Sequence, residues 1–282
     1  MTGSFASRFA LARESYGPLV WGLDPSGLLL DEWELGDSPD GLERFVDIVV
    51  EAAVGAVGLV KPQSAFYERH GWRGIRALGR LVAAVRAEGL LAILDAKRGD
   101  VGSTNEAYAE AYFGPDAPIE VDALTVHPYL GLGAMDALVA GAAKSESCLL
   151  VMTRSSNPEG RSVQAAVDDE QRRVEQCLLD EIQSLNAAFA PGEIGPIGAV
   201  FAPTRLEPQL DLVAPNALFL APGVGRQGAT PQDVAAVFAA CPERVMPSAS
   251  RSLLSHGPDR GRLRDEVNAL AEQFRALLMH DS

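Results

Sequence analysis

The sequence predicts an α/β fold in which eight parallel strands, each followed by a helix, close into a (β/α)8 TIM barrel. Short apolar, β-rich runs alternate with segments whose apolar residues recur every three or four positions. Eight such alternations in 282 residues suit a barrel of the usual size. Polar residues also stand at the ends of the apolar runs, and in a barrel they would converge on one mouth. A doubly wound sheet is the alternative, and this placement of polar residues favours the barrel over it.

The elements follow one another in order along the chain. The expected strands span residues 19–24, 56–61, 90–97, 121–127, 148–153, 197–201, 217–221 and 244–248. The expected helices span residues 40–54, 72–87, 103–113, 132–143, 161–189, 205–213, 231–240 and 259–279. Thr230-Pro231 places a proline at a first helical position, and Ser103 with Glu106 predicts a capping box. Residues 160–196 are long for one loop and helix, and we assign them no role.

Composition indicates one large globular domain over residues 1–282, since 47% of the residues are hydrophobic and glycine and proline are spread along the chain. Lys and Arg total 24 against 38 Asp and Glu, a formal charge of −14, which opposes binding to nucleic acid or to an anionic membrane. The three cysteines are far apart and lack metal-ligand spacing, which favours a reducing cytoplasm. No stretch of about 18 consecutive apolar residues and no apolar leader occur, so we expect a soluble, cytoplasmic protein.

The segment Asp95-Ala96-Lys97-Arg98-Gly99-Asp100 follows an apolar run over residues 90–94. Successive side chains of a strand alternate between its faces, so Asp95 and Lys97 should point the same way. Asp100 follows Gly99, outside the strand, and can approach the same place only from another direction. A surface ion-pair turn is the alternative, and the apolar run before the charges disfavours it.

A second cluster consists of two loops that follow the seventh and eighth expected strands, with the sequences APGVGRQG at 221–228 and PSASRS at 247–252. Barrels commonly bind phosphate in these two loops, through backbone N–H groups and a guanidinium. We take Arg251 as the anchor. A glycine-rich loop by itself often does no more than turn the chain. Arg226 either approaches the phosphate or is simply solvated.

With both clusters in view, the chain resembles the orotidine 5′-phosphate decarboxylase family, and more particularly its longer bacterial branch. The resemblance covers nearly the whole chain and rests on six motifs in order: Gly22-Leu23-Asp24-Pro25, Lys61-Pro62-Gln63, Asp95-x-Lys97-x-x-Asp100, Arg154-Ser155-Ser156-Asn157-Pro158, Pro222-Gly223-Val224-Gly225-x-Gln227-Gly228 and Ser250-Arg251-Ser252. It implies a homodimeric barrel of de novo pyrimidine biosynthesis. Such an enzyme converts orotidine 5′-monophosphate to UMP and CO2 without a metal or an organic cofactor.

The resemblance also implies a role for each charged residue of the first cluster. Lys97 is then the proton donor to C6 of the pyrimidine, Asp95 faces the departing CO2 group, and Lys61 completes their hydrogen-bonded chain. Asp100 and Thr104 reach across the dimer interface into the neighbouring site. Taken alone, Lys61 could extend from a strand end into solvent, and Thr104 could be an ordinary first-turn helix residue.

For the substrate-binding residues, the resemblance implies that Asp24 binds the ribose hydroxyls and that Ser156 reads the pyrimidine edge. Gln227 and Arg251 clamp the phosphate, beside the backbone of Gly225. Asp24 before Pro25 could instead only start a turn. A shift of one residue would exchange Ser155 for Ser156 at the base, and we prefer Ser156.

One strand-end residue is left out of the predicted site. His127 also ends a strand, but a histidine with satisfied hydrogen bonds in the core or just behind the site is commoner than a catalytic one, and the proposed chemistry needs no imidazole.

Two other functions remain as alternatives. A phosphosugar enzyme of the same superfamily would share the DxKxxD motif but use a divalent metal to stabilise an enediolate, and it would need a further acid at a strand end. Glu68 lies too far beyond its strand to be a convincing ligand. The second alternative is a non-catalytic phosphoribosyl-binding protein, which would tolerate loss of Lys97.

Overall fold

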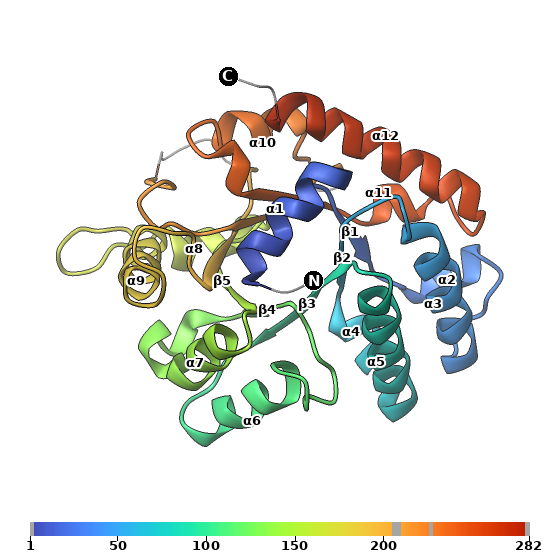
Figure 1. Ribbon diagram of the computed structural model, residues 1–282, viewed down its shortest axis with the longest axis horizontal. Helices are drawn as coiled ribbons and strands as arrows, with labels where there is room; N and C mark the ends of the chain where they lie inside the picture. The colour runs from blue at the N-terminus through green and yellow to red at the C-terminus, as the bar shows by residue number, and fades with distance from the viewer. Residues whose placement is uncertain (1–2, 205–209, 226–227, 280–282) are drawn as a thin grey trace.

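A computed structural model describes residues 3–204, 210–225 and 228–279, and it shows a closed barrel of eight parallel strands (Figure 1). The strands are β1 (Val20–Leu23), β2 (Leu59–Pro62), β3 (Leu91–Arg98), β4 (Ala123–Val126), β5 (Cys148–Arg154), β6 (Ile197–Phe201), β7 (Phe219–Pro222) and β8 (Val245–Ala249). Val20 of β1 aligns with Leu59 of β2 on one side and with Ser248 of β8 on the other. This closure confirms the (β/α)8 prediction and excludes the doubly wound sheet.

Helices lie around the outside of the barrel and across one end of it (Figure 1). They are α1 (Phe5–Tyr16), α2 (Gly27–Glu32), α3 (Pro39–Ala53), α4 (Ser64–Glu68), α5 (Gly71–Ala87), α6 (Ser103–Tyr112), α7 (Asp136–Lys144), α8 (Arg161–Gln164), α9 (Val174–Phe189), α10 (Pro231–Val237), α11 (Arg251–Leu254) and α12 (Arg260–Leu278). Within the described ranges, no helix is both long enough and apolar enough to cross a membrane. Helix α10 begins as its sequence predicts, because the Thr230 hydroxyl accepts from the Asp233 N–H at 3.1 Å and Pro231 is the first helical residue.

Strand alternation divides the core into an inner and an outer layer. Leu91 and Ile93 of β3 belong to an apolar cluster inside the barrel, whereas Ala92 and Leu94 pack outward with the surrounding helices. The same alternation places Asp95 on the inner side, directly above Ile93. The barrel's apolar interior therefore ends at a charged residue.

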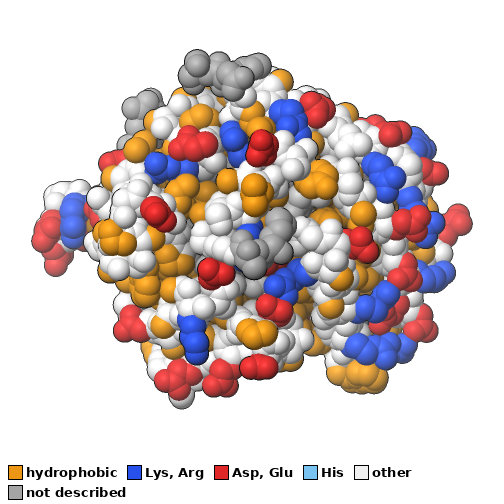
Figure 2. Space-filling view, viewed as in Figure 1, with side chains coloured by type: hydrophobic (Ala, Val, Ile, Leu, Met, Phe, Trp, Pro, Cys, Tyr) orange, Lys and Arg blue, Asp and Glu red, His pale blue; other side chains and the backbone are white. Residues whose placement is uncertain are grey.

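Helices α3 and α5 show how the outer layer is held. Their inner faces are apolar, and their outer faces are joined by ion pairs between arginines of α5 and carboxylates of α3. Glu43 of α3 pairs with Arg76 at 3.1 Å and with Arg80 at 2.6 Å, and Asp47 also pairs with Arg80 at 2.6 Å. Figure 2 shows acidic and basic side chains interspersed on the face it presents. On that face the negative net charge is not gathered into one patch.

Helix α1 was not predicted, and it closes the N-terminal end of the barrel, crossing its centre in Figure 1. Phe5 and Phe9 of this helix are buried in the inner apolar cluster, together with first strand residues such as Leu59 and Leu91. The catalytic end of a (β/α)8 barrel is the opposite one. Helix α1 therefore covers the end of the barrel opposite the predicted site.

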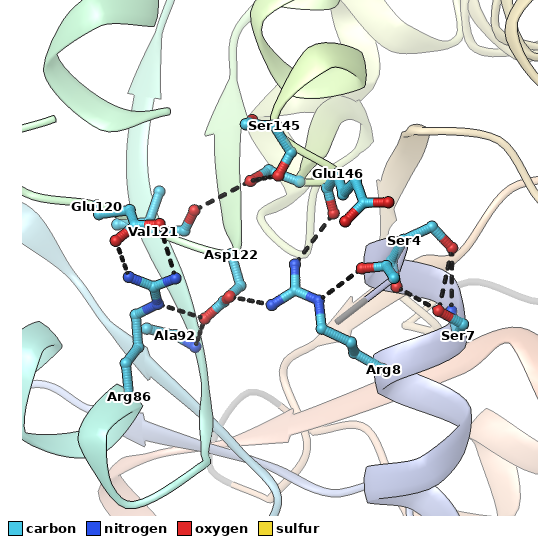
Figure 3. Close-up of polar contacts among 12 residues, drawn as sticks. Ser4, Ser7, Arg8, Arg86, Ala92, Glu120, Val121, Asp122, Ser145 and Glu146 are labelled. Atoms are coloured by element: carbon cyan, nitrogen blue, oxygen red, sulfur yellow. Dashed lines mark hydrogen bonds and ion pairs between the residues drawn. The ribbon is translucent and has the colours of Figure 1, made fainter. Parts of the chain in front are cut away.

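An ion-pair network fastens α1 to the barrel (Figure 3). Arg8 pairs through Nη1 with Asp122, which immediately precedes β4, and donates from Nη2 to the Glu146 carbonyl at 3.0 Å. Asp122 also accepts from the Ala92 N–H at 2.8 Å and lies 3.3 Å from Nε of Arg86. Arg8 is 8% exposed and Asp122 2% exposed, so both charges are buried and both depend on these partners.

Three helix predictions need correction. Residues 161–189 do not form one helix, because residues 165–173 separate α8 from α9. There the Asp168 carboxylate accepts the N–H groups of Glu170 at 2.9 Å and Arg172 at 2.8 Å, which competes with helical hydrogen bonding. Of the helix expected at 205–213, residues 210–213 are not helical and residues 205–209 lie outside the described part. At 132–143 the helix starts only at Asp136, after a 3-10 turn over Leu132–Met135.

The capping box expected at Ser103 and Glu106 is also wrong. Gly102 is the N-cap of α6, with φ of +54°, and Ser103 is already helical. The left-handed conformation at this point suits glycine, which explains why no hydroxyl caps the helix.

Candidate active site

A cavity of about 670 Å3 opens at the C-terminal ends of the strands. Side chains that line it include Asp24 after β1, Lys61 of β2, Asp95 and Lys97 of β3, and Thr125 of β4. The strand-end residues thus lie together, at the end of the barrel where (β/α)8 enzymes carry their active sites.

Asp95 is the centre of the charged group in this cavity. Its Oδ1 accepts from Lys97 Nζ at 2.6 Å and from Thr125 Oγ1 at 2.8 Å. Its Oδ2 lies 3.3 Å from Lys61 Nζ and accepts from Gln63 Nε2 at 3.0 Å. Three side chains from strands β2, β3 and β4, together with Gln63 directly after β2, therefore hold the Asp95 carboxylate in one orientation.

Electrostatics keep this group charged. Burial tends to raise the pKa of Asp95, but the nearby Lys61 and Lys97 outweigh it and lower the pKa to about 2. Burial tends to lower the pKa of Lys61, but Asp24 and Asp95 raise it above its usual value. At neutral pH an ionised Asp95 therefore lies beside a protonated Lys61, with only 8% and 6% of the two residues exposed.

The backbone of β3 is irregular where it carries Lys97. The pairing of β3 with β4 shifts register between Leu94 and Arg98, and Lys97 has φ of +46°, in the left-handed region. Such a conformation costs a non-glycine residue about 1–3 kcal/mol and persists only where surrounding contacts hold it. The Lys97 N–H donates to Thr125 Oγ1 at 3.0 Å, which is one such contact.

Two buried polar atoms of the cavity, one on Asp24 and one on Ser250, lack a hydrogen-bond partner among the described residues. Asp24 Oδ1 and Ser250 Oγ are both buried and make no hydrogen bond within the described residues, and both residues line the cavity. Buried polar atoms are nearly always hydrogen-bonded, so this pair is suited to a ligand with hydroxyl groups.

The two adjacent serines after β5 differ in their contacts. The Ser155 hydroxyl lies 2.7 Å from Asn157 Oδ1 and accepts from Gln164 Nε2 at 2.8 Å, and the Ser155 N–H donates to Gln164 Oε1 at 3.1 Å. Ser156 lines the same cavity, and its hydroxyl makes no hydrogen bond to any residue that the structure describes. The Ser156 hydroxyl is therefore the one available to a ligand.

The predicted phosphate side is partly described. Arg251 lines the cavity as the first residue of α11. Gly225 has φ of +83°, and a Cβ there would lie 3.0 Å from Ser252 Oγ, so this turn requires glycine. Gln227 and Arg226 lie outside the described residues.

Asp100 and Thr104 do not line the cavity of their own chain. The Asp100 carboxylate accepts from the Val101 N–H at 2.8 Å, and across the described ranges no ion pair joins it to Lys97. Thr104 is exposed. Within the described part of one chain, Lys97 is thus paired with Asp95 and not with Asp100.

Gln63, Thr125 and Ser250 are site residues that sequence reasoning missed. Thr125 carries a signal that could have revealed it, because it is a hydroxyl inside the apolar run Ala123-Leu124-Thr125-Val126. Gln63 and Ser250 belong to the quoted motifs but gave no hint of where they point.

One other expectation is wrong, because the side chain of His127 is exposed instead of lying in the core. Glu68 lines the cavity, where it is ion-paired with Arg98. Among the described residues, no three His, Cys, Asp or Glu side chains are grouped so that they could hold a metal ion.

Comparison with known proteins agrees with this geometry. Residues 17–264 match the family model described as "Orotidine 5'-phosphate decarboxylase / HUMPS family". Proteins named orotidine 5′-phosphate decarboxylase from Salinispora arenicola and Streptomyces coelicolor are each 45% identical to this chain. The matches cover 98% of this chain and 98% of the first protein, and 96% of this chain and 97% of the second. A crystal structure of a Streptomyces avermitilis protein matches with a TM-score of 0.93 and 44% identity, over 99% of this chain and 97% of that one.

Proposed function

Since the chain belongs to the orotidine 5′-phosphate decarboxylase / HUMPS family, we propose that it converts orotidine 5′-monophosphate to UMP and CO2, with Lys97 as the proton donor to C6. The observation that carries this proposal is the buried Asp95 carboxylate, held between Lys61 and Lys97 at the base of the cavity. The enzyme is a carboxy-lyase of UMP biosynthesis.

The chemistry requires positive charge at C6 before CO2 leaves. Loss of CO2 leaves a carbanion at a ring position with little resonance delocalisation. The Lys97 ammonium, 2.6 Å from Asp95, faces this position, stabilises the developing charge and then transfers its proton to C6. This interaction is stronger in the transition state than in the ground state, so it lowers the barrier.

Asp95 has two functions in this scheme. It orients the Lys97 ammonium, and it lies beside the substrate carboxylate, so that departure of CO2 relieves repulsion between two anions. Lys61 balances the Asp95 charge from the other side at 3.3 Å, which keeps Asp95 ionised in the buried site.

The remainder of the substrate extends along the cavity. Asp24 binds the ribose hydroxyls, and its unpartnered Oδ1 supports this role. Ser156 reads the pyrimidine edge, since the Ser155 hydroxyl is already engaged with Gln164 and Asn157. Arg251 and the backbone at Gly225 bind the phosphate, and Gln227 completes the clamp.

The active assembly is a homodimer, with Asp100 and Thr104 of each chain contributed to the neighbouring site. The exposed apolar side chains Val101, Tyr129 and Leu130 support this assembly, since Val101 directly follows Asp100 and a subunit contact would cover apolar surface.

Residues 1–282 form one domain. The reaction needs no metal or organic cofactor, and the free thiols suit a reducing cytoplasm.

A single assay separates this function from its alternatives. Purified protein is incubated with orotidine 5′-monophosphate in excess EDTA, and the fall in pyrimidine absorbance is followed. Undiminished turnover supports metal-independent decarboxylation. Activity that disappears with the metal would favour the phosphosugar type of chemistry, and binding without turnover would favour a phosphoribosyl-binding protein.

A further inference from the structure

Thr125 connects the two residues on which the proposed chemistry depends, although it belongs to a different strand. It lies on β4, two residues after Ala123 on the same inner side of the barrel, and is 1% exposed. Its hydroxyl is 2.8 Å from Asp95 Oδ1 and 3.0 Å from the Lys97 backbone nitrogen.

The direction of both hydrogen bonds follows from the chemistry of the groups. An ionised carboxylate can only accept, and a backbone N–H can only donate. The one hydroxyl proton of Thr125 therefore goes to Asp95, and its oxygen lone pair accepts from Lys97. One side chain thus fixes the carboxylate and, at the same time, the backbone of the residue that carries the ammonium.

The backbone at Lys97 needs such support. Between Leu94 and Arg98 the register of β3 against β4 is shifted, and ladder pairing resumes only at Arg98, opposite Val126. In the interrupted stretch the Lys97 N–H donates to a side chain of the facing strand, while Lys97 holds φ of +46°. A lysine backbone in the left-handed region persists only where neighbouring contacts hold it there.

We propose that Thr125 is a positioning residue for decarboxylation, which sets the place of the Lys97 ammonium through Asp95 Oδ1 and the Lys97 backbone. The inference rests on the proposed function. Thr125 itself transfers no proton. Its effect is to hold the charged pair in one arrangement, so that no reorganisation is needed when charge develops at C6.

The test uses two substitutions that separate the hydroxyl of Thr125 from its methyl group. Thr125→Val removes the hydroxyl and keeps the branched shape, whereas Thr125→Ser keeps the hydroxyl. Hydrogen bonds to charged groups contribute enough that kcat should fall about 10- to 100-fold in Thr125→Val, while KM stays near that of the wild type. Thr125→Ser should keep kcat within about threefold of wild type, because both hydrogen bonds can form.

A matched control lies one strand further along. Thr153 of β5 is 0% exposed and donates from Oγ1 to the Val200 carbonyl at 2.8 Å, so Thr153→Val also removes one buried hydroxyl from a barrel strand. Among the described residues, the Thr153 hydroxyl makes no hydrogen bond to a charged group of the site, so kcat of Thr153→Val should stay within about twofold of wild type. Wild-type kcat in folded Thr125→Val, or equal losses in Thr125→Val and Thr153→Val, would overturn the proposal.

A structural readout keeps the inference separate from the proposed function. If the wild-type protein does not decarboxylate orotidine 5′-monophosphate, the proposed function fails, and a crystal structure of Thr125→Val still tests the positioning role. Lys97 should then leave the left-handed region, or the Asp95 carboxylate should rotate away from Lys97 Nζ. Unchanged geometry at both residues would overturn the inference, and Thr125→Ala replaces Thr125→Val if the latter does not fold.

Discussion

Substitution of Arg8 by methionine tests whether the ion-pair network between helix α1 and the barrel contributes to the free energy of unfolding. Methionine keeps much of the apolar stem of arginine but removes the guanidinium. The change deletes the ion pair with Asp122 and the 3.0 Å hydrogen bond to the Glu146 carbonyl. It leaves a carboxylate that is 2% exposed.

The expected magnitude follows from what remains around Asp122. Removing one partner of a buried ion pair typically costs about 3–5 kcal/mol. Here Arg86 Nε stays 3.3 Å from the carboxylate and the Ala92 N–H still donates at 2.8 Å, so we expect the lower end of this range. A loss of about 3 kcal/mol corresponds to a fall in Tm of about 6–12 °C for a protein of this size.

Equilibrium urea unfolding, followed by far-UV circular dichroism, measures this loss. Arg76→Met is the matched control, because Arg76 pairs with Glu43 at 3.1 Å while its side chain is 60% exposed, and it should cost less than about 1 kcal/mol. The double variant Arg8→Met with Asp122→Asn keeps an acceptor for Ala92 but no unpaired charge. It should recover about 1 kcal/mol or more of the loss.

The result that refutes this reasoning is a loss below about 1 kcal/mol in Arg8→Met, comparable to that of Arg76→Met. A double variant as unstable as Arg8→Met would show that the cost does not come from the unpaired carboxylate. kcat of the folded Arg8→Met protein should equal that of the wild type, since Asp122 lies at the end of the barrel opposite the site.

Three further predictions concern the site. Lys97→Ala and Asp100→Ala proteins, each inactive alone, should regain activity when mixed, because a mixed dimer restores one intact site; failure despite demonstrated subunit exchange would contradict a shared site. Ser156→Ala should raise KM about threefold to tenfold, and more than Ser155→Ala does; the reverse order would assign the base to Ser155. Burial tends to raise the pKa of Asp95, but Lys61 and Lys97 lower it to about 2. The ionised carboxylate therefore stabilises the fold fully above its usual pKa of 3.8, and this stabilisation is lost as the pH falls toward 2. Asp95→Asn should therefore show a shallower loss of unfolding free energy than wild type between pH 4 and pH 2, and parallel curves would contradict this assignment.

Local patterns were sufficient for much of the fold. Each strand is an apolar run that the sequence displays directly, and Thr230 with Pro231 starts α10 as their residue types predict. Helix α1 gave no comparable signal, because Arg8 interrupts the buried positions Phe5, Phe9 and Ala12. Arg8 is tolerated there only because Asp122, 114 residues away, neutralises it.

The same distinction applies to the site. Asp95 and Lys97 are two residues apart on one strand, so simple alternation places them together. Thr125 is 30 residues from Asp95 in sequence, and only the pairing of β3 with β4 brings the two into contact. Within the described part of one chain, no hydrogen bond or ion pair joins Asp100 to Lys97. Its predicted role therefore depends on a second chain, which no pattern within this sequence can place.

Closure of the barrel between β1 and β8 has a consequence for the order in which the chain folds during synthesis. The N-terminal part of the chain leaves the ribosome first, and Val20 cannot pair with Ser248 until 228 further residues have been added. Until then, one edge of β1 has no strand beside it, and an open edge can pair with another chain. Folding of the nascent protein therefore depends on keeping this edge covered until β8 has been synthesised.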